Sequence, residues 1–524
     1  MVRTDSKWSD RFMVGSTTRV NWTALQNGSD IRGVALTGVP DEPVNLNTEV
    51  VTTLSQAFVT WLAAKLDKPA TQLVIAVGRD SRLSGPTLMS AAIAGMAALG
   101  SRVYDVGMAS TPAMFMSTVL PEFSCDGAIM LTASHLPFNR NGLKFFTRQG
   151  GLGKADITAI LQRAEAGETF TPAPTAGAIE TRDLIGAYAT GLVQQIRQAV
   201  NHPDHFDQPL QGLKIVVDAG NGAGGFYADQ VLAPLGADTT GSQFLDPDGT
   251  FPNHVPNPEN AEAMAAICQA VIAHQADFGI IFDTDVDRGA AVDHEGRELN
   301  RNRLIALISA IVLQAHPGST IVTDSITSDG LTQFIETELG GIHHRFKRGY
   351  KNVINESMRL NEAGQESWLA IETSGHGAMK ENYFLDDGAY LVSKLLAELA
   401  KARLAGQRLT DLITTLQEPR ESGEFRLKIQ VPDFQTHGTA VIEQLQAFVT
   451  TQTDWTVVPK NYEGIRVACP AAAENGWFLL RLSLHDPVLP LNIESNVEGG
   501  VEQIKARLRT FFTTLEGLDT SALD

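Results

Sequence analysis

The sequence predicts an α/β protein with several domains. Three observations support this class: a length of 524 residues, short apolar runs that end in Gly, Asp or Asn, and Ala/Leu-rich stretches with helical spacing between them. Single hydrophobic cores stop growing at roughly 250–300 residues, so three or four domains are expected. Alternating strands and helices favour layered α/β units with largely parallel sheets, whose functional residues collect beyond the carboxyl ends of strands.

The apolar runs are predicted buried strands, because each is short and is bounded by turn-forming residues. They cover residues 73–78, 213–218, 278–283 and 319–324. Helices are predicted at residues 86–99, 261–274 and 302–313. The composition changes after about residue 420, where an alternating edge-type strand, a second strand and a closing helix indicate a small α+β domain. These three elements cover residues 424–429, 476–482 and 501–515.

The same changes of pattern set the predicted domain organisation. We place boundaries after residues 205, 298 and 422, at a precision of several residues. The predicted units are an N-terminal extension (1–27) and four domains, 28–205, 206–298, 299–422 and 423–524.

Composition limits the classes of partner. The formal net charge of −19 argues against a general nucleic-acid binder, and a phosphorylated substrate would need local basic residues to overcome the overall field. No run of 18 or more apolar residues predicts a membrane span, and the first 19 residues lack the order of a secretory signal. The three cysteines are isolated, which favours a reducing compartment. We expect a cytoplasmic protein, with a plastid stroma as the alternative.

One serine lies among groups suited to a phosphate. Ser134 follows the apolar run 128–131, so it is predicted in a loop just after a strand, and His135 and Lys144 are close in sequence. A serine hydroxyl is a poor nucleophile unless it is activated or already phosphorylated. A phosphoserine would carry about −1.5 to −2 charges and three acceptor oxygens, which Lys144 could contact. The alternative is a Ser/His turn without chemistry.

Three carboxylates alternate after the third predicted strand. Asp283, Asp285 and Asp287 would point to one side of an extended loop and would repel each other without a cation. Oxygen-only ligands favour Mg²⁺ over Zn²⁺, and a phosphoserine oxygen could be a further ligand. Arg288 could reach the phosphate or a carboxylate. The alternative is a solvated acidic turn.

Two further loops suit a sugar phosphate. Glu372 and Ser374 alternate after an apolar run and could bind two adjacent hydroxyls, and His376 could act as a general acid or base. Near the C-terminus, Arg481 and Ser483 could bind a phosphate. Each pattern is weak by itself, since a lone histidine is more often structural.

Together these segments resemble the α-D-phosphohexomutase superfamily, which includes phosphoglucomutase, phosphomannomutase and phosphoglucosamine mutase. The resemblance covers roughly residues 28–500 and rests on the joint order of the loops. It extends to further segments at residues 29–33, 77–85, 218–224, 252–259 and 349–351.

The resemblance implies a four-domain, heart-shaped enzyme with a central cleft, built from three related α/β domains and a smaller, mobile α+β domain. It implies that Ser134 is the phosphoserine and, with the three aspartates, a magnesium ligand. Roles in transfer and proton movement fall to Arg32, Lys144 and His376, with His135 in support. Substrate contacts fall to Arg288, Lys351, Glu372, Ser374, Arg481 and Ser483.

The implied reaction interconverts hexose 1-phosphate and hexose 6-phosphate. Phosphorylated Ser134 would give its phosphate to a hexose monophosphate, and the hexose 1,6-bisphosphate, which also serves as activator, would turn over in the cleft before the other phosphate returns. Mg²⁺ is the expected metal, and the expected partners are sugar phosphates, without nucleic acid or membrane, for a monomer or homodimer.

The sequence departs from the usual family pattern in several loops. Leu136 replaces an asparagine and Ile371 a glycine, Thr284 and Val286 replace glycines in the acidic loop, and residues 484–486 change the terminal phosphate loop. A changed phosphate loop leaves open a hexose 1,6-bisphosphate synthase that uses another phosphate donor. Residues 141–146 resemble the phosphoglucosamine mutase branch, which is a second possibility. A non-catalytic sugar-phosphate sensor that keeps the fold is a third.

Overall fold

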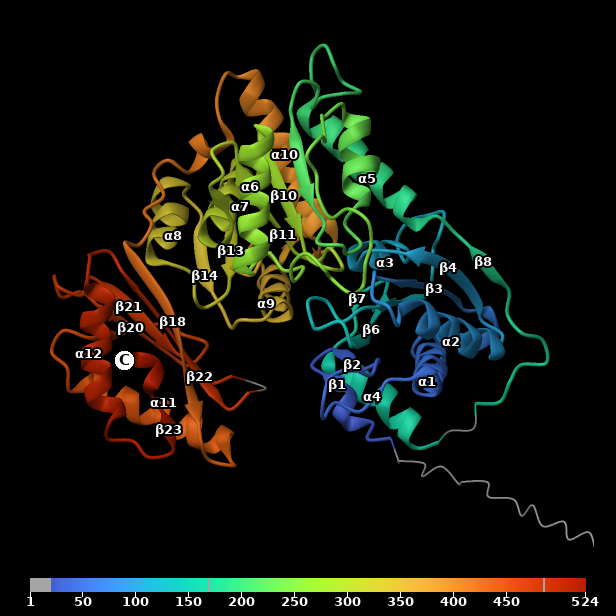
Figure 1. Ribbon diagram of the computed structural model, residues 1–524, viewed down its shortest axis with the longest axis horizontal. Coiled ribbons are helices and arrows are strands. Elements are labelled where there is room, and N and C mark those ends of the chain that lie inside the picture. The colour runs from blue at the N-terminus through green and yellow to red at the C-terminus, as the bar shows by residue number, and fades with distance from the viewer. Residues whose placement is uncertain (1–19, 168–169, 484–485) are drawn as a thin grey trace, which may run out of the picture.

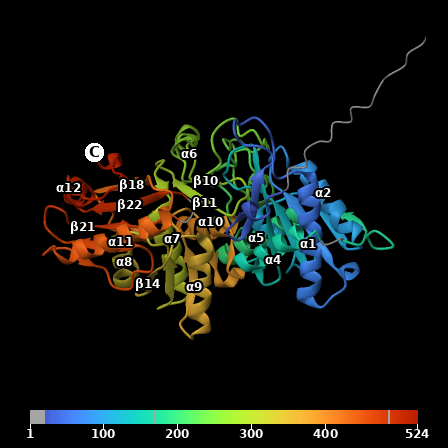
Figure 2. The ribbon, with the colours of Figure 1, turned by 90° about the horizontal axis from the view of Figure 1, so that it is seen from below.

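The computed structural model describes residues 20–167, 170–483 and 486–524. These residues form four β-sheets in chain order, and we name the units built on them domains I to IV. Figure 1 shows an arch in which domains I and IV are the two arms and domains II and III form the middle, and Figure 2 shows the same order along the long axis. The predicted four-domain, heart-shaped α/β architecture is confirmed.

Domain I is built on an eight-stranded sheet in the order β1-β2-β6-β5-β3-β4-β8, with β7 paired to β6. Its strands are β1 (Gln26–Asn27), β2 (Asp30–Val34), β3 (Val74–Arg79), β4 (Arg102–Met108), β5 (Gly127–Leu131), β6 (Arg140–Thr147), β7 (Gly150–Gly151) and β8 (Ile179–Thr181). Its helices are η1 (Thr23–Leu25), α1 (Thr48–Leu66), η2 (Ala70–Gln72), α2 (Gly85–Ala98), α3 (Thr111–Met116), α4 (Lys154–Glu165) and α5 (Leu184–Val200).

Domains II and III repeat this layered plan on smaller sheets, in the orders β12-β11-β10-β9 and β14-β13-β15-β16-β17. The elements of domain II are β9 (Ile215–Asp218), η3 (Tyr227–Leu232), η4 (Ala233–Leu235), α6 (Ala261–His274), β10 (Phe278–Phe282), β11 (Gly289–Asp293) and β12 (Glu298–Leu299). Those of domain III are α7 (Arg301–Ala315), β13 (Thr320–Thr323), α8 (Asp329–Gln333), η5 (Phe334–Glu338), β14 (Ile342–Arg345), α9 (Tyr350–Glu362), β15 (Ser367–Ile371), β16 (Gly377–Met379), η6 (Lys380–Asn382), β17 (Leu385–Asp386), α10 (Gly388–Leu404) and η7 (Leu409–Ile413).

The expectation of largely parallel sheets needs correction, because all three of these sheets are mixed. In each domain a buried strand pairs in parallel on one side and continues through a loop into an antiparallel strand: β5 into β6, β10 into β11, and β15 into β16. The connecting loops are the serine loop (132–139), the acidic loop (283–288) and the sugar loop (372–376). A return strand holds both ends of such a loop, so its side chains have less freedom than in an open connection to a helix.

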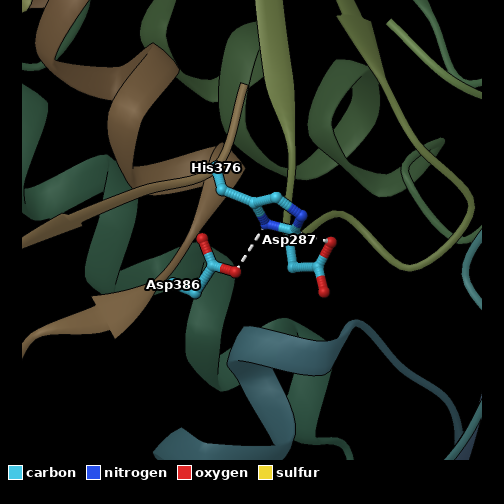
Figure 3. A group of neighbouring side chains, drawn as sticks. All are labelled: Asp287, His376 and Asp386. Carbon is cyan, nitrogen blue, oxygen red and sulfur yellow. Dashed lines mark hydrogen bonds and ion pairs between the residues drawn. The ribbon is translucent and has the colours of Figure 1, made fainter. Parts of the chain in front are cut away.

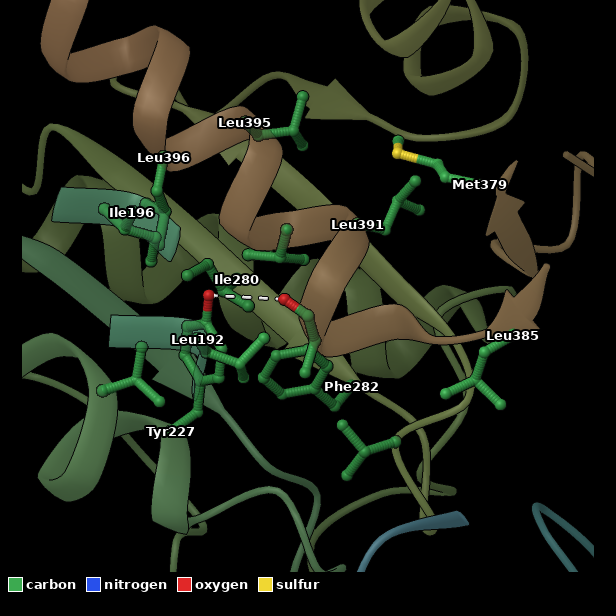
Figure 4. Packing of buried hydrophobic residues seen from close by; sticks show 14 of the residues in the cluster. Leu192, Ile196, Tyr227, Ile280, Phe282, Met379, Leu385, Leu391, Leu395 and Leu396 are labelled. Atoms are coloured by element: carbon green, nitrogen blue, oxygen red, sulfur yellow. Dashed lines mark hydrogen bonds between the residues drawn. The ribbon is translucent and has the colours of Figure 1, made fainter. Parts of the chain in front are cut away.

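A continuous apolar core joins domains I, II and III. It extends from Ala76 to Leu409 and includes residues of α3, α5, β10, α7 and α10. Figure 4 shows part of it, where Leu192 of α5 and Phe282 of β10 pack below Leu391 of α10. A fully buried Leu or Phe stabilises the fold by about 1.5–3 kcal/mol, so the shared core holds the three domains firmly together.

Domain IV is an antiparallel sheet in the order β19-β20-β21-β22-β18-β23 with two helices. Its elements are β18 (Glu421–Ile429), α11 (Phe434–Thr450), β19 (Thr456–Val457), β20 (Ile465–Cys469), β21 (Gly476–Leu480), β22 (Val488–Ser495), α12 (Gly500–Phe512), β23 (Leu518–Asp519) and η8 (Ser521–Leu523). The segment predicted as an edge strand is β18, which has β22 on one side and, along Lys428 and Ile429 only, the two-residue β23 on the other.

Domain IV has its own apolar core, formed by residues between Leu427 and Leu523. Polar groups join it to domain III. The Arg466 guanidinium, with 3% of the side chain exposed, donates to the carbonyls of Ser325 (2.9 Å) and Thr327 (3.0 Å) and to Asp329 (3.0 Å). The Ser325 hydroxyl in turn donates to Glu463 at 2.5 Å.

The predicted domain boundaries remain a proposal. The one after residue 298 falls within β12 and the one after residue 422 within β18. Of the predicted N-terminal extension, residues 1–19 lie outside the described residues, whereas β1 pairs with β2 in the sheet of domain I.

Candidate functional site

Three domains bring their loops to one place. The serine, acidic and sugar loops each follow the carboxyl end of a buried strand, as expected for this class of sheet. Contacts join the three domains here: Arg288 of the acidic loop forms a β-bridge with His376 of the sugar loop, and the Thr111 amide of α3 in domain I donates to the Asp285 carbonyl at 2.8 Å.

The serine loop directs Ser134 toward domain II. Ser134 is 6% exposed and has a left-handed backbone (φ 50°), and its amide donates to the Thr132 hydroxyl at 2.9 Å. Its hydroxyl donates to Asp283 Oδ2 at 3.1 Å and lies 3.3 Å from His135 Nδ1. The predicted position of Ser134, in a loop immediately after a strand, is confirmed by β5.

The acidic loop is a tight turn, so the prediction of an extended loop is wrong. Val286 has φ 66°, a conformation that is costly for a β-branched residue, and its amide donates to the Asp283 carbonyl at 3.3 Å. The turn still gathers the three carboxylates: one oxygen from each of Asp283, Asp285 and Asp287 lies within 4.8 Å of the others.

These carboxylates suit a hard divalent cation. All three are at most 1% exposed, and Oδ1 of Asp285 and Oδ1 of Asp287 are buried without a hydrogen-bond partner among the described residues. Buried polar atoms normally have partners, and oxygen donors of this kind are those that Mg²⁺ prefers. The residues therefore fit the metal that the sequence suggests.

Lys144 supplies the positive charge that faces the acidic loop. From β6 its ammonium donates to Asp287 Oδ2 (2.5 Å) and Asp285 Oδ2 (3.1 Å), and the Thr111 hydroxyl also donates to Asp285 Oδ2 (2.5 Å). Burial opposes the charged ammonium, but the two carboxylates outweigh it and hold the pKa of Lys144 well above its usual value. Burial, with Asp287 and Asp285 nearby, raises the pKa of Asp283.

His376 lies between two carboxylates (Figure 3). Its Nδ1 is 2.6 Å from Asp386 Oδ2 and 3.9 Å from Asp287 Oδ1, and the Tyr350 ring stacks on it at 5.0 Å. Burial alone would lower the pKa of His376, but Asp386 and Asp287 raise it to about 9. The imidazole is therefore a charged proton donor near neutral pH.

Two arginines line the serine side. Arg32 donates to the Ala133 carbonyl (2.6 Å) and to Asp30 (3.0 Å). Arg288 donates to Asp283 Oδ2 (3.2 Å), to the Ser134 hydroxyl (3.4 Å) and to His135 Nδ1 (2.7 Å). Burial and the Arg288 charge lower the pKa of His135 to about 3, so this imidazole is neutral.

The sugar loop presents a buried carboxylate and a hydroxyl. Glu372 is 3% exposed, accepts from the Gly349 amide at 2.5 Å, and receives the Ser374 hydroxyl at 3.3 Å. Burial, with Asp324 nearby, raises the pKa of Glu372 to about 7. Glu372 and Ser374 thus lie together, as their alternation predicts.

Lys351 contacts domain I. Its ammonium donates to the Leu152 carbonyl of domain I, and it lines a cavity of about 190 Å³ with Lys144, Tyr350 and Asp386. In contrast to Glu372 and Ser374, this side chain therefore contacts domain I.

Domain IV borders a large cleft. A cavity of about 1070 Å³ separates it from domains II and III and is lined by Glu259, Arg348, Thr373 and Arg426, among others. Arg481 follows β21; its Nε is buried without a hydrogen-bond partner among the described residues, and Glu463 and Arg348 are among its charged neighbours. Ser483 Oγ accepts from the Asp486 amide at 3.2 Å. Leu484 and His485 lie outside the described residues.

Several side chains in this region carry little local sequence signal. Asp386 belongs to none of the motifs identified in the sequence. Thr111 is 174 positions from its partner Asp285, and Arg348 pairs with Glu259 of another domain at 3.3 Å. The one signal for Arg348 is its position directly before the segment at residues 349–351.

Comparisons with known proteins agree with this arrangement. Family models described as phosphoglucomutase/phosphomannomutase alpha/beta/alpha domains I, II and III match residues 24–170, 190–296 and 300–419. A phosphomannomutase/phosphoglucomutase of Pseudomonas putida is 32% identical over 84% of this chain and 88% of its own length. A protein of Xanthomonas campestris named phosphohexose mutases is 32% identical over 93% of this chain and 98% of its own length.

A solved structure gives the same result in three dimensions. The phosphoglucomutase/phosphomannomutase family protein of Burkholderia thailandensis superimposes with a TM-score of 0.75 at 29% identity, covering 93% of this chain and 96% of that one. No helix in the described parts of the chain combines the length and apolar character that a membrane span requires.

Proposed function

The chain belongs to the phosphoglucomutase/phosphomannomutase family, and on this premise we propose that it interconverts hexose 1-phosphates and hexose 6-phosphates through a phosphoserine at Ser134. The observation that carries the proposal is the contact between two domains, in which the Ser134 hydroxyl lies 3.1 Å from Asp283. A phosphate on this oxygen would lie beside the carboxylate cluster that suits a divalent cation.

The metal ligands in this proposal are Asp283, Asp285, Asp287 and a phosphate oxygen on Ser134. Mg²⁺ bound there would neutralise charge on the transferring phosphate. The side chains that hold the phosphate in place are Arg288, whose guanidinium already reaches the Ser134 hydroxyl at 3.4 Å, and Arg32, which fixes the loop through the Ala133 carbonyl. The neutral His135 supports Arg288 by accepting its hydrogen bond.

The transfer step moves one phosphoryl group and one proton. The bond between phosphorus and Ser134 Oγ breaks, a bond to the sugar hydroxyl oxygen forms, and the proton of that hydroxyl leaves. Ser134 Oγ takes up a proton as it departs and loses it again when the other phosphate returns. Lys144 and His376 both contact Asp287 of the acidic loop and are both charged near neutral pH, so either can give a proton to the departing Ser134 Oγ and then take up the proton that leaves the sugar hydroxyl.

Substrate recognition falls to the sugar loop and domain IV. Glu372 and Ser374 would bind adjacent sugar hydroxyls, and Arg481 and Ser483 would hold the phosphate that is not reacting. Lys351 has a weaker case, since its ammonium contacts domain I, and Arg348 on the cleft wall is the better cation there. The hexose 1,6-bisphosphate formed in the first transfer must turn over before the second; the large cleft beside domain IV reaches the sugar loop at Thr373, and Ser134 is not among its lining residues.

A substrate panel combined with intact mass measurement tests the proposal. The purified chain should gain the mass of one phosphate on incubation with glucose 1,6-bisphosphate and Mg²⁺, and Ser134→Ala should not. With a trace of that bisphosphate, it should convert glucose 1-phosphate or mannose 1-phosphate. A third arm with glucosamine 1-phosphate reports whether the chain is a phosphoglucosamine mutase instead.

The same experiment separates a bisphosphate synthase from a sugar-phosphate sensor. Accumulation of free bisphosphate from a second phosphate donor would indicate a synthase. Absence of both phosphorylation and turnover on all three sugars would overturn the mutase proposal and favour a sensor.

A further inference from the structure

One buried arginine, Arg82, binds the backbone of the serine loop. Arg82 is fully buried, and its two terminal nitrogens donate to four carbonyl oxygens of that loop and its return strand. The acceptors are the carbonyls of Ser134 (2.5 Å), Leu136 (2.6 Å), Pro137 (2.8 Å) and Arg140 (2.9 Å). A guanidinium has five N–H donors in a planar fork, so this one side chain can satisfy several carbonyls at once.

This contact explains the unusual shape of the loop. The carbonyls of residues 134, 136 and 137 can all point inward to one cation only if the chain turns sharply, and Ser134 is held at φ 50°. A non-glycine residue in this conformation persists only when its surroundings fix it. Because Arg82 binds the carbonyl of Leu136, the replacement of the usual asparagine there leaves the backbone contact unchanged.

Arg82 is itself fixed from two sides. Asp80 lies 3.3 Å from Arg82 Nε and accepts from the Arg82 amide at 2.9 Å. The Phe251 ring of domain II covers the guanidinium at 5.3 Å, and a Cβ on Gly249 would lie 2.7 Å from the Arg82 Cα. The support of the serine loop is therefore in contact with the domain that carries the acidic loop.

We propose that Arg82 is a positioning residue for phosphoryl transfer, which sets the place of the Ser134 oxygen relative to the acidic loop without touching substrate. The inference rests on the proposed function and extends it to residues 79–82, a motif to which the mechanism assigns no role. Phosphoryl transfer depends mainly on positioning, and a displacement of about 1 Å can cost roughly 100-fold in rate. Loss of the carbonyl contacts should thus slow transfer and leave sugar binding intact.

The test compares Arg82→Lys with Arg140→Lys in the full chain. Both change an arginine near the same loop, but the Arg140 side chain points outward to Glu42 (2.5 Å). The measured quantities are the rate of Ser134 phosphorylation by glucose 1,6-bisphosphate, followed by intact mass, and kcat and KM for glucose 1-phosphate. Arg82→Lys should lower the phosphorylation rate and kcat by about 100-fold with KM within about twofold, and Arg140→Lys should keep both rates.

The outcomes separate this inference from the proposed function. If the unchanged chain is never phosphorylated, the proposed function fails; if it is phosphorylated and a folded Arg82→Lys is equally fast, only the inference fails. A loss confined to KM would also overturn it. Should Arg82→Lys not fold, Phe251→Leu removes the ring that covers the guanidinium, which should loosen the guanidinium and weaken its four carbonyl bonds. It should then slow phosphorylation about fivefold, and an unchanged rate would overturn the inference.

Discussion

Domains I to III and domain IV are held in the molecule by different means. The first three share one apolar core from Ala76 to Leu409, whereas domain IV has a separate core and meets domain III through Arg466, Ser325 and Glu463. Apolar packing is lost steeply on small displacements, but polar contacts can be exchanged for water at little net cost.

The difference matches two demands of a phosphoryl transfer site. The proposed reacting groups, Ser134 and the three aspartates, lie in the part with the shared core, where their distances are fixed. The candidate phosphate-binding residues Arg481 and Ser483 lie in domain IV, whose polar contacts with domain III would let it shift if the proposed substrate binds in two orientations. The comparison indicates a division of roles: the apolar interface among domains I to III fixes the proposed reacting groups, and the polar interface of domain IV allows different substrate orientations.

The largest effect is expected in the rigid part. Asp285→Asn removes one charge from the acidic loop and one partner from Lys144 and Thr111, so turnover should fall by about a thousandfold or more. Kinetics with saturating Mg²⁺ measure this, and circular dichroism checks that the fold is kept. The matched control is Asp229→Asn on the exposed side of η3, and normal activity in Asp285→Asn would contradict the assigned role.

The interface of domain IV should respond to Arg466→Met. This change leaves the carbonyls of Ser325 and Thr327 without their donor and removes the stack on Trp477 (3.5 Å). Docking of domain IV should weaken by about 2–4 kcal/mol, measured by hydrogen exchange along β20 and β21, with a loss of about tenfold in kcat/KM. The control Arg426→Met removes two ion pairs of an exposed arginine, with Glu424 and Asp486, and should change docking by less than about 1 kcal/mol. Equal protection from hydrogen exchange in Arg466→Met and Arg426→Met would contradict the proposed role of Arg466 in the docking of domain IV.

A third prediction concerns pH. Burial raises the pKa of Glu494 to about 7 from an ordinary value of 4.5, and its charged neighbours are Arg466, Asp329 and Arg345. At a pH between these two pKa values, Glu494 is protonated in the folded state and ionised in the unfolded chain. The free energy of unfolding therefore falls as pH rises from about 4.5 to about 7. Unfolding of domain IV should be about 1–3 kcal/mol easier at the upper end. Glu494→Gln should reduce this slope, and an identical slope in the variant would rule out Glu494 as its source.

The smallest effect is expected for Ser325→Ala. It removes one hydrogen bond to Glu463, which keeps the Arg348 amide as a partner at 3.2 Å. Docking should weaken by about 0.5–1.5 kcal/mol with a change of a few-fold in KM, measured by steady-state kinetics and hydrogen exchange. A loss as large as that of Arg466→Met would show that the interface depends on this single contact.

Much of the fold and part of the site could be predicted from local patterns. The strands before Ser134, Asp283 and Glu372 are short apolar runs with turn signals, so the positions of their loops follow from the sequence. The return strands β6, β11 and β16 could not be predicted in this way. A tight turn such as the one at Val286 requires a valine with a left-handed backbone conformation, which no residue propensity favours. The same turn explains why the acidic loop is not extended.

The rest depends on contacts between distant positions. Asp386 becomes a partner of His376 only because β17 pairs with β16, and Thr111 meets Asp285 only after domains I and II dock. Arg82 is missed for another reason: an arginine predicts an exposed position, and only the carbonyls of the folded serine loop make burial favourable. Lys351 is a further example, since its place in a motif does not determine that its ammonium meets the Leu152 carbonyl.

The shared core also has a consequence during synthesis on the ribosome. Side chains near Ala76 and Met114 belong to an apolar cluster whose last members are close to Leu409. At translation rates of about 5–20 residues per second, these surfaces stay uncovered for tens of seconds in the nascent chain. The architecture that immobilises the reacting groups therefore creates a long interval of aggregation risk and a demand for chaperones.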